Sequence, residues 1–128
     1  ADVDVVNFIE EKNPDGGYFV ISNQMTSAAA LQELGFKYYH QTREGEVLWY
    51  AIPTGGPLYT FFWDMMFNGP RREVMEGAAD FTGAKNGYFI IHSYWPHSES
   101  IIDFAKPTAD NFFRIRDDEV VLFEYIFN

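Results

Sequence analysis

Few side chains in this sequence have the type and spacing that catalysis requires. The three histidines are His40, His92 and His97, and no two of them have the spacing of zinc ligands. The absence of cysteine excludes thiol catalysis and cysteine-bound metal. The nucleophile elbow of serine hydrolases and the glycine patterns that bind phosphate are also missing. We therefore expect a protein without enzymatic activity, metal or cofactor.

Two polar residues adjoin or interrupt apolar runs and are candidates for binding. His92 ends the run 88–91, where a hydrogen-bonded histidine of the core or of a pocket fits best. Asp103 interrupts the run 101–104. On a strand, Asp103 would either accept a hydrogen bond from a ligand N–H in a pocket or face water at a sheet edge. Both alternatives remain open from the residues alone.

Aromatic residues make up 19% of the chain, and 13 of them are phenylalanine. They are densest between Tyr59 and Phe67, just before an expected helix and strand, so these elements can form one wall of a pocket or pack as plain core. Tryptophan and tyrosine carry polar groups that favour the pocket, and methionine lets such a wall adapt in shape. The candidate ligand-binding residues are Trp49, Tyr50, Tyr59, Phe62, Trp63, Met66, Tyr88, His92 and Asp103.

Length and charge limit the classes of function. A chain of 128 residues fits a single domain spanning 1–128. Its net charge of −10 repels phosphate backbones, so we expect no direct binding to nucleic acid. No apolar run approaches the roughly 20 residues of a membrane span, and no signal peptide is visible. We therefore expect a cytoplasmic protein without a membrane partner.

Hydrophobic patterning predicts an α+β fold. Helices are expected at 2–12, 27–34, 58–67 and 71–81, with a last helix from 108 or 110 to 127. Strands are expected at 18–22, 36–41, 46–52 and 88–94, and at 100–105 as the antiparallel partner of 88–94. A break near Asp117 would instead make 112–116 a strand. The expected architecture is an antiparallel sheet sandwiched by helices, an α-β-α sandwich with the outline of PAS and GAF domains.

Four segments in order resemble the ligand-binding domain of LuxR-type quorum-sensing transcription factors. They are Phe-Trp-Asp at 62–64, the helix 71–81, the Asn-Gly turn and strand at 86–92, and Ile-Ile-Asp-Phe-Ala at 101–105. The resemblance implies that Trp63 closes the pocket for the ligand head group, that Gly87 opens a strand and that Asp103 contacts the ligand. The family's Trp-x3-Tyr and Asp-Pro signatures are absent, so the signal need not be an acyl-homoserine lactone.

Three hypotheses of function follow. The first is a sensor domain that binds a small signal molecule in an aromatic pocket, shifts a homodimer equilibrium, and reaches DNA through a domain outside this chain. The second is an acidic protein–protein interaction module that binds no ligand and recognises a basic partner. The third, ranked lowest because no nucleophile accompanies the histidine, is a small enzyme with His92 as its base.

Overall fold

The structure is a computed structural model that describes residues 2–13, 18–22, 57–93, 95–115 and 119–127. The expected helix at 27–34 and the expected strands at 36–41 and 46–52 lie outside the described residues, as do His40, Trp49 and Tyr50.

The described strands form one mixed four-stranded sheet in the order β1-β2-β4-β3. The strands are β1 (Tyr18–Ile21), β2 (Asn86–His92), β3 (Asn111–Ile115) and β4 (Val120–Ile126). β1 runs parallel to β2, whereas β4 is antiparallel to both β2 and β3. The predicted α+β class is confirmed, but the sheet is mixed rather than antiparallel throughout.

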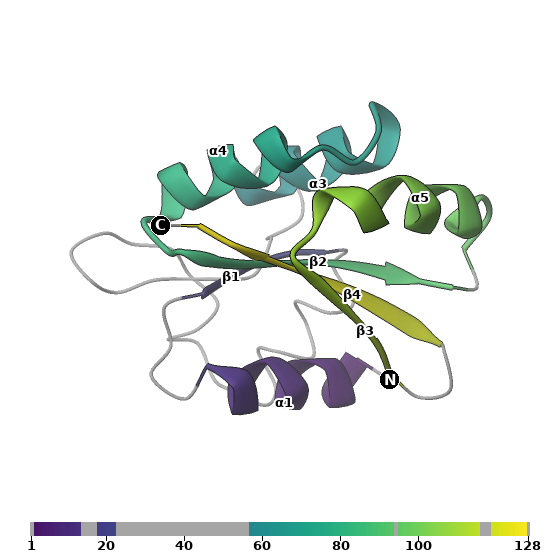
Figure 1. Cartoon of the computed structure of the whole chain (residues 1–128), viewed down its shortest axis with the longest axis horizontal. Helices are drawn as coiled ribbons and strands as arrows, with labels where there is room; N and C mark the ends of the chain where they lie inside the picture. Colours follow the sequence, from purple (N-terminus) through teal and green to yellow (C-terminus); the bar gives the residue numbers. More distant parts are fainter. Residues whose placement is uncertain (1, 14–17, 23–56, 94, 116–118, 128) are drawn as a thin grey trace.

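Helices lie on both sides of this sheet (Figure 1). Helix α1 (Asp2–Lys12) is on one side, and α3 (Pro57–Phe67), α4 (Arg72–Thr82) and α5 (Ser98–Ala105) are on the other. A short 3-10 turn, η2 (Lys106–Thr108), leads from α5 toward β3. The outline of a PAS or GAF domain remains a prediction.

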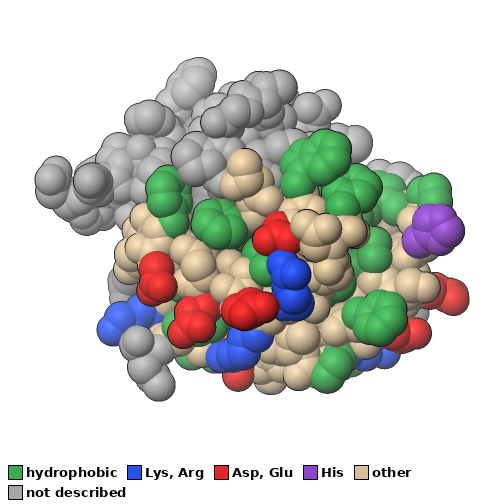
Figure 2. Space-filling model, turned by 90° about the horizontal axis from the view of Figure 1, so that it is seen from above, with side chains coloured by type: hydrophobic (Ala, Val, Ile, Leu, Met, Phe, Trp, Pro, Cys, Tyr) green, Lys and Arg blue, Asp and Glu red, His purple; other side chains and the backbone are tan. Residues whose placement is uncertain are grey.

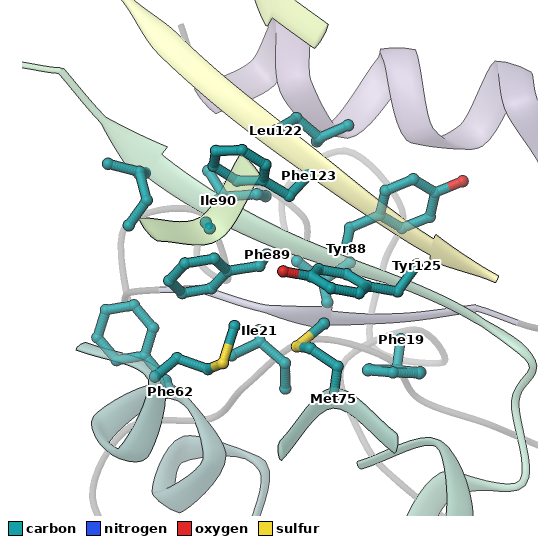
Figure 3. Packing of buried hydrophobic residues seen from close by; sticks show 14 of the residues in the cluster. Phe19, Ile21, Phe62, Met75, Tyr88, Phe89, Ile90, Leu122, Phe123 and Tyr125 are labelled. Carbon is teal, nitrogen blue, oxygen red and sulfur yellow. The ribbon is translucent and has the colours of Figure 1, made fainter. Parts of the chain in front are cut away.

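The two central strands are buried along almost their whole length. β2 and β4 consist largely of consecutive β-branched and aromatic residues, a composition that suits strands covered on both faces. Phe89 and Phe123 are paired across these strands, with ring centroids 6.2 Å apart. Figure 3 shows Phe62 and Met75 pointing from the helices toward the sheet. The core therefore lies mainly between the sheet and the α3–α4 layer, with a second apolar layer beneath α1.

The strand predicted at 100–105 is wrong, because these residues belong to helix α5. Ser98, Ile102 and Ala105 are buried and lie on one face at helical spacing, which the short Ile-Ile-Asp-Phe run obscured. The antiparallel partner of β2 is β4 instead.

The predicted helix from 108 or 110 to 127 is also wrong, because these residues form β3 and β4. The alternative with a break near Asp117 placed a strand at 112–116, which agrees with β3 to within one residue at each end. Six consecutive residues of β4, from Val120 to Tyr125, are buried. A surface helix buries only one stripe and cannot bury such a run.

Helices α3 and α4 confirm the predicted helices at 58–67 and 71–81, but not all of the expected burial. The apolar sequence of 58–67 predicts a largely buried helix, but Trp63 and Phe67 are 51% and 67% exposed. The spacing of Val74, Ala78 and Phe81 predicts one core face of the next helix, but Phe81 is exposed. Val74 and Ala78 are buried as predicted, and Gly83 ends α4 in the left-handed conformation.

Arg72 fastens the start of α4 to both ends of the C-terminal hairpin. Its guanidinium donates hydrogen bonds to the carbonyl oxygens of Thr108 and Ile126, each at 3.0 Å, and forms an ion pair with Asp110 at 3.2 Å. It also lies over the Phe127 ring, 4.8 Å from the centroid. These contacts fix where η2 and β3 begin relative to the helix layer.

Gly87 gives the first prediction, because its backbone approaches a buried ring. A Cβ atom at Gly87 would lie 2.1 Å from Cζ of Phe19, its neighbour on β1. We expect Gly87→Ala to lower the free energy of unfolding by about 3 kcal/mol, since either the ring or the strand must move. Urea unfolding of the two proteins measures the difference.

Gly77→Ala provides the matched control. A Cβ atom there would meet Phe61 Cε1 at 3.3 Å, and Phe61 is only partly buried. Alanine also favours a helix over glycine by about 1 kcal/mol, so the control should stay within about 1 kcal/mol of wild type. Equal stability of Gly87→Ala and Gly77→Ala would contradict the packing argument.

Candidate functional site

A polar cleft of about 500 Å³ opens beside α5. It is lined by Ser93, Ser98, Glu99, Ile102, Asp103, Lys106 and Arg114. Its volume falls within the range of about 300–1,000 Å³ that is usual for small-molecule sites. The lining differs from that of most such sites, because Ile102 is the one apolar member among the described residues.

One helix supplies most of the lining. Residues 98, 99, 102, 103 and 106 recur at intervals that bring them to the same side of α5 and its continuation into η2. Glu99 and Asp103 are one helical turn apart, and Lys106 follows about 4.5 Å further along the axis. The buried Ile102 anchors this side of the helix to the sheet. The charged groups of α5 therefore form an ordered row along the cleft.

The opposite wall comes from β3. Arg114 lies in the cleft lining, and its Cζ is 5.8 Å from the ring centroid of Phe112. Lys106 Nζ lies 5.3 Å from the same centroid. The two cations thus gather around one half-exposed aromatic ring, a favourable cation–π arrangement.

Two serines close the end of the cleft at the C-terminus of β2. Ser98 Oγ donates to the carbonyl oxygen of Ser93 at 2.7 Å, and Ser93 Oγ donates to that of Glu119 at 3.0 Å. Because each hydroxyl proton is already used, the free capacity of both oxygens is to accept hydrogen bonds. This end of the cleft suits a donor group on a ligand.

The described side chains of the aromatic candidates differ in their surroundings. Phe62 is buried and meets Trp95 edge to face, with centroids 6.5 Å apart, whereas Trp63 points outward and stacks on Phe67 at 4.4 Å. Met66 is partly buried against the core, and Tyr59 lies on α3.

The two polar candidates have separate environments. His92 is buried at the end of β2, with its ring centroid 4.7 Å from that of Trp95. Asp103 lines the cleft, but from a helix and with an exposed side chain. The prediction that it lies on a strand is therefore corrected, because α5 replaces the expected strand.

A buried polar network beneath α1 went unnoticed in the sequence. Tyr88 Oη donates to Glu124 Oε2 at 2.8 Å, and Asn13 Nδ2 donates to Tyr88 Oη at 2.7 Å. Asn111 Nδ2 donates to Glu124 Oε1 at 2.9 Å, and Lys12 Nζ lies 3.8 Å from Glu124 Oε2. Glu124 interrupts an otherwise apolar run in the sequence, and this interruption could have indicated a buried polar group. Each member has a partner here, so the network serves structure.

Burial changes the acidity of two tyrosines. It raises the pKa of Tyr88 well above its usual range, and the hydrogen bond to Glu124 adds to that effect while the one from Asn13 opposes it. Burial also raises the pKa of Tyr125 to about 12, partly offset by its hydrogen bond with Thr108. Both tyrosines therefore stay protonated at neutral pH.

The described residues contain no group of three or more histidine or acidic side chains arranged to hold a metal ion. Within the same residues, no helix is long and apolar enough to cross a membrane.

Comparison with protein-family models, curated proteins and solved structures found no match to this chain. The resemblance to LuxR-type regulators therefore remains a prediction.

The raised pKa of Tyr125 predicts a loss of stability at alkaline pH. In the unfolded chain this phenol titrates near pH 10, whereas in the folded protein it titrates at about 12. The folded state therefore binds more protons between these values, and stability falls as pH rises through this window. We expect the contribution of Tyr125 to this loss to approach about 2 kcal/mol at pH 12.

Urea unfolding at pH 8, 10 and 11 measures this dependence. Tyr125→Phe should show a shallower decline than wild type, together with a constant loss of about 1 kcal/mol from the missing hydrogen bond. Identical slopes for the two proteins would contradict the assignment.

Proposed function

We propose that this chain is a ligand-binding sensor domain of a transcription regulator similar to the LuxR type, and that its ligand binds in the cleft beside α5. The observation that carries the proposal is that cleft, with its volume of about 500 Å³ and its ordered row of charged groups. The regulator would be cytoplasmic and would reach DNA through a further domain.

The cleft supports a different kind of ligand from the one expected of an aromatic pocket. Phe62 and Tyr88 are buried in the core, so protein atoms already occupy the space around these two proposed wall residues. The lining of the cleft is polar and charged, which favours a small polar molecule over an acyl chain. Among the described candidate residues, Asp103 lines the cleft.

Ligand binding can act on the regulator through the parts that the cleft joins. α5, the end of β2 and β3 all contribute to it, so a bound molecule would hold these elements together. Binding to the folded state alone stabilises that state by mass action. A change in the balance between monomer and homodimer is the proposed output.

A small-molecule library screened by thermal unfolding tests this function. We expect at least one compound to raise the melting temperature of wild type by roughly 5–10 °C near saturation. Asp103→Asn should lose most of this increase, because its side chain lies in the cleft. Glu76→Gln is the matched control, since Glu76 is exposed on α4 and does not line the cleft.

Two outcomes would count against the proposal. If no compound stabilised wild type, ligand binding would be the wrong function. If a compound stabilised wild type and Asp103→Asn equally, the ligand would bind elsewhere on the chain.

The exposed pair Trp63 and Phe67 favours a second candidate, a docking surface for a basic protein. Large stacked rings at the surface are typical of interaction sites. The neighbouring Asp64 is hydrogen bonded to Asn68 and Arg71, and these contacts hold the pKa of its carboxyl below the usual range. Figure 2 views the molecule from the side of the sheet that carries α3, α4 and α5, where hydrophobic side chains lie in separate groups among acidic and basic ones.

Paired substitutions test the docking surface. We expect a basic partner, once isolated and purified, to bind wild type and to lose about tenfold or more in affinity for Trp63→Ala combined with Phe67→Ala. Phe104→Ala is the control, because Phe104 is equally exposed but lies on α5. Equal losses in both proteins, measured by calorimetry, would point to a general effect of removing surface rings.

A further inference from the structure

Among the described residues that line the cleft, two acidic and two basic side chains occur, in a chain that is acidic as a whole. Glu99, Asp103 and Lys106 lie along α5 and η2, and Arg114 comes from β3, whereas the whole chain carries −10. A simple cation in the cleft is repelled by the two bases, and a simple anion by the two acids. A molecule that carries both charges gains from both pairs, so the lining selects against singly charged competitors.

We propose that the ligand of this cleft is a small zwitterion with an ammonium group and a carboxylate, such as a free α-amino acid or a dipeptide. This inference rests on the proposed ligand-binding function and names the chemical class that the same cleft recognises.

The ammonium group belongs at the end of the cleft that offers acceptors. Ser93 and Ser98 donate their hydroxyl protons to backbone carbonyl oxygens and therefore present lone pairs. Glu99 and Asp103 add two carboxylates on the adjoining face of α5, and neither forms an ion pair with another described residue. An ammonium ion has three donors and no acceptor, which matches this set.

The carboxylate belongs beside the two cations that surround Phe112. A guanidinium such as that of Arg114 presents paired N–H donors that fit the two oxygens of a carboxylate. Lys106 adds a second positive charge near the same ring. Asp103 and Lys106 are separated by about 4.5 Å along the helix axis, so one small molecule can reach both.

The size and the lining of the cleft agree with an amino acid or dipeptide as the ligand. A volume of about 500 Å³ holds an amino acid or a dipeptide, with space left for water. Ile102 is apolar and lines the cleft, so it can contact a short side chain of the ligand. A long acyl chain would meet charged groups on both walls.

The experiment is isothermal calorimetry on the full chain with the twenty common α-amino acids and a set of dipeptides. For the best binder, two blocked forms are compared: the N-acetyl derivative, which lacks the ammonium, and the C-terminal amide, which lacks the carboxylate. We expect each blocked form to bind about tenfold or more weakly than the zwitterion, because a charge-assisted contact is lost.

Two variants assign each charge to its end of the cleft. Asp103→Asn should weaken the zwitterion and the amide by about tenfold and leave the N-acetyl form unchanged. Lys106→Gln should weaken the zwitterion and the N-acetyl form and leave the amide unchanged. Both side chains reach the surface of the cleft, and circular dichroism confirms that the variants remain folded. Glu76→Gln should bind like wild type.

The possible failures can be told apart. Equal binding of the zwitterion and either blocked form, or equal losses for all three ligands in both variants, would overturn the zwitterion assignment. If no amino acid or dipeptide bound but another compound did so in an Asp103-dependent manner, the class would be wrong and the sensor function would stand. If nothing in the wider library bound, both proposals would be wrong.

Discussion

The structure depends on a carboxylate buried in an apolar sheet. Glu124 is 5% exposed, and an isolated charge at such a depth would cost several kcal/mol. Its two oxygens accept hydrogen bonds from Tyr88 and Asn111 and lie near the ammonium of Lys12. These partners come from α1, β2 and β3, so satisfying one side chain of β4 fixes the position of three other elements. A slip of β4 by one residue would turn Glu124 toward the apolar α3–α4 layer, where its partners are absent.

The opposite face of the sheet is organised by packing, and the cleft is the part that packing leaves open. Phe62 and Met75 point from α3 and α4 toward the sheet (Figure 3), and Ile102 of α5 is buried. Arg72 ties η2 and the end of β4 to α4, which sets the point where the chain turns back toward β3. The helix layer therefore does not cover this face of β3, and Phe112 and Arg114 stay exposed next to α5. A cleft at this position is a consequence of the topology.

Local patterns in the sequence were sufficient for elements whose period was unambiguous. α1, β1, α3 and α4 follow directly from apolar spacing, glycine positions and β-branched content. Local patterns were insufficient at 98–105, because the apolar run of four residues fits both the helical and the strand period. They were also insufficient at 120–126, where burial on both faces of the sheet removes the alternation that marks a strand. Of the described residues that line the cleft, Asp103 was the one that the sequence had indicated as a candidate for binding. Arg114 and Lys106 join it through tertiary structure that the sequence does not display.

Salt dependence distinguishes the two candidate functions, which are ligand binding in the cleft beside α5 and protein docking at Trp63 and Phe67. An acidic chain of net charge −10 attracts a basic protein over distances near the Debye length, so added salt should weaken that association strongly. A zwitterion has no net charge, and its contacts with the cleft act over a few ångströms, where screening is weaker. Binding that persists at high salt would therefore indicate the cleft beside α5. Binding that disappears would indicate the Trp63–Phe67 surface and its acidic surroundings.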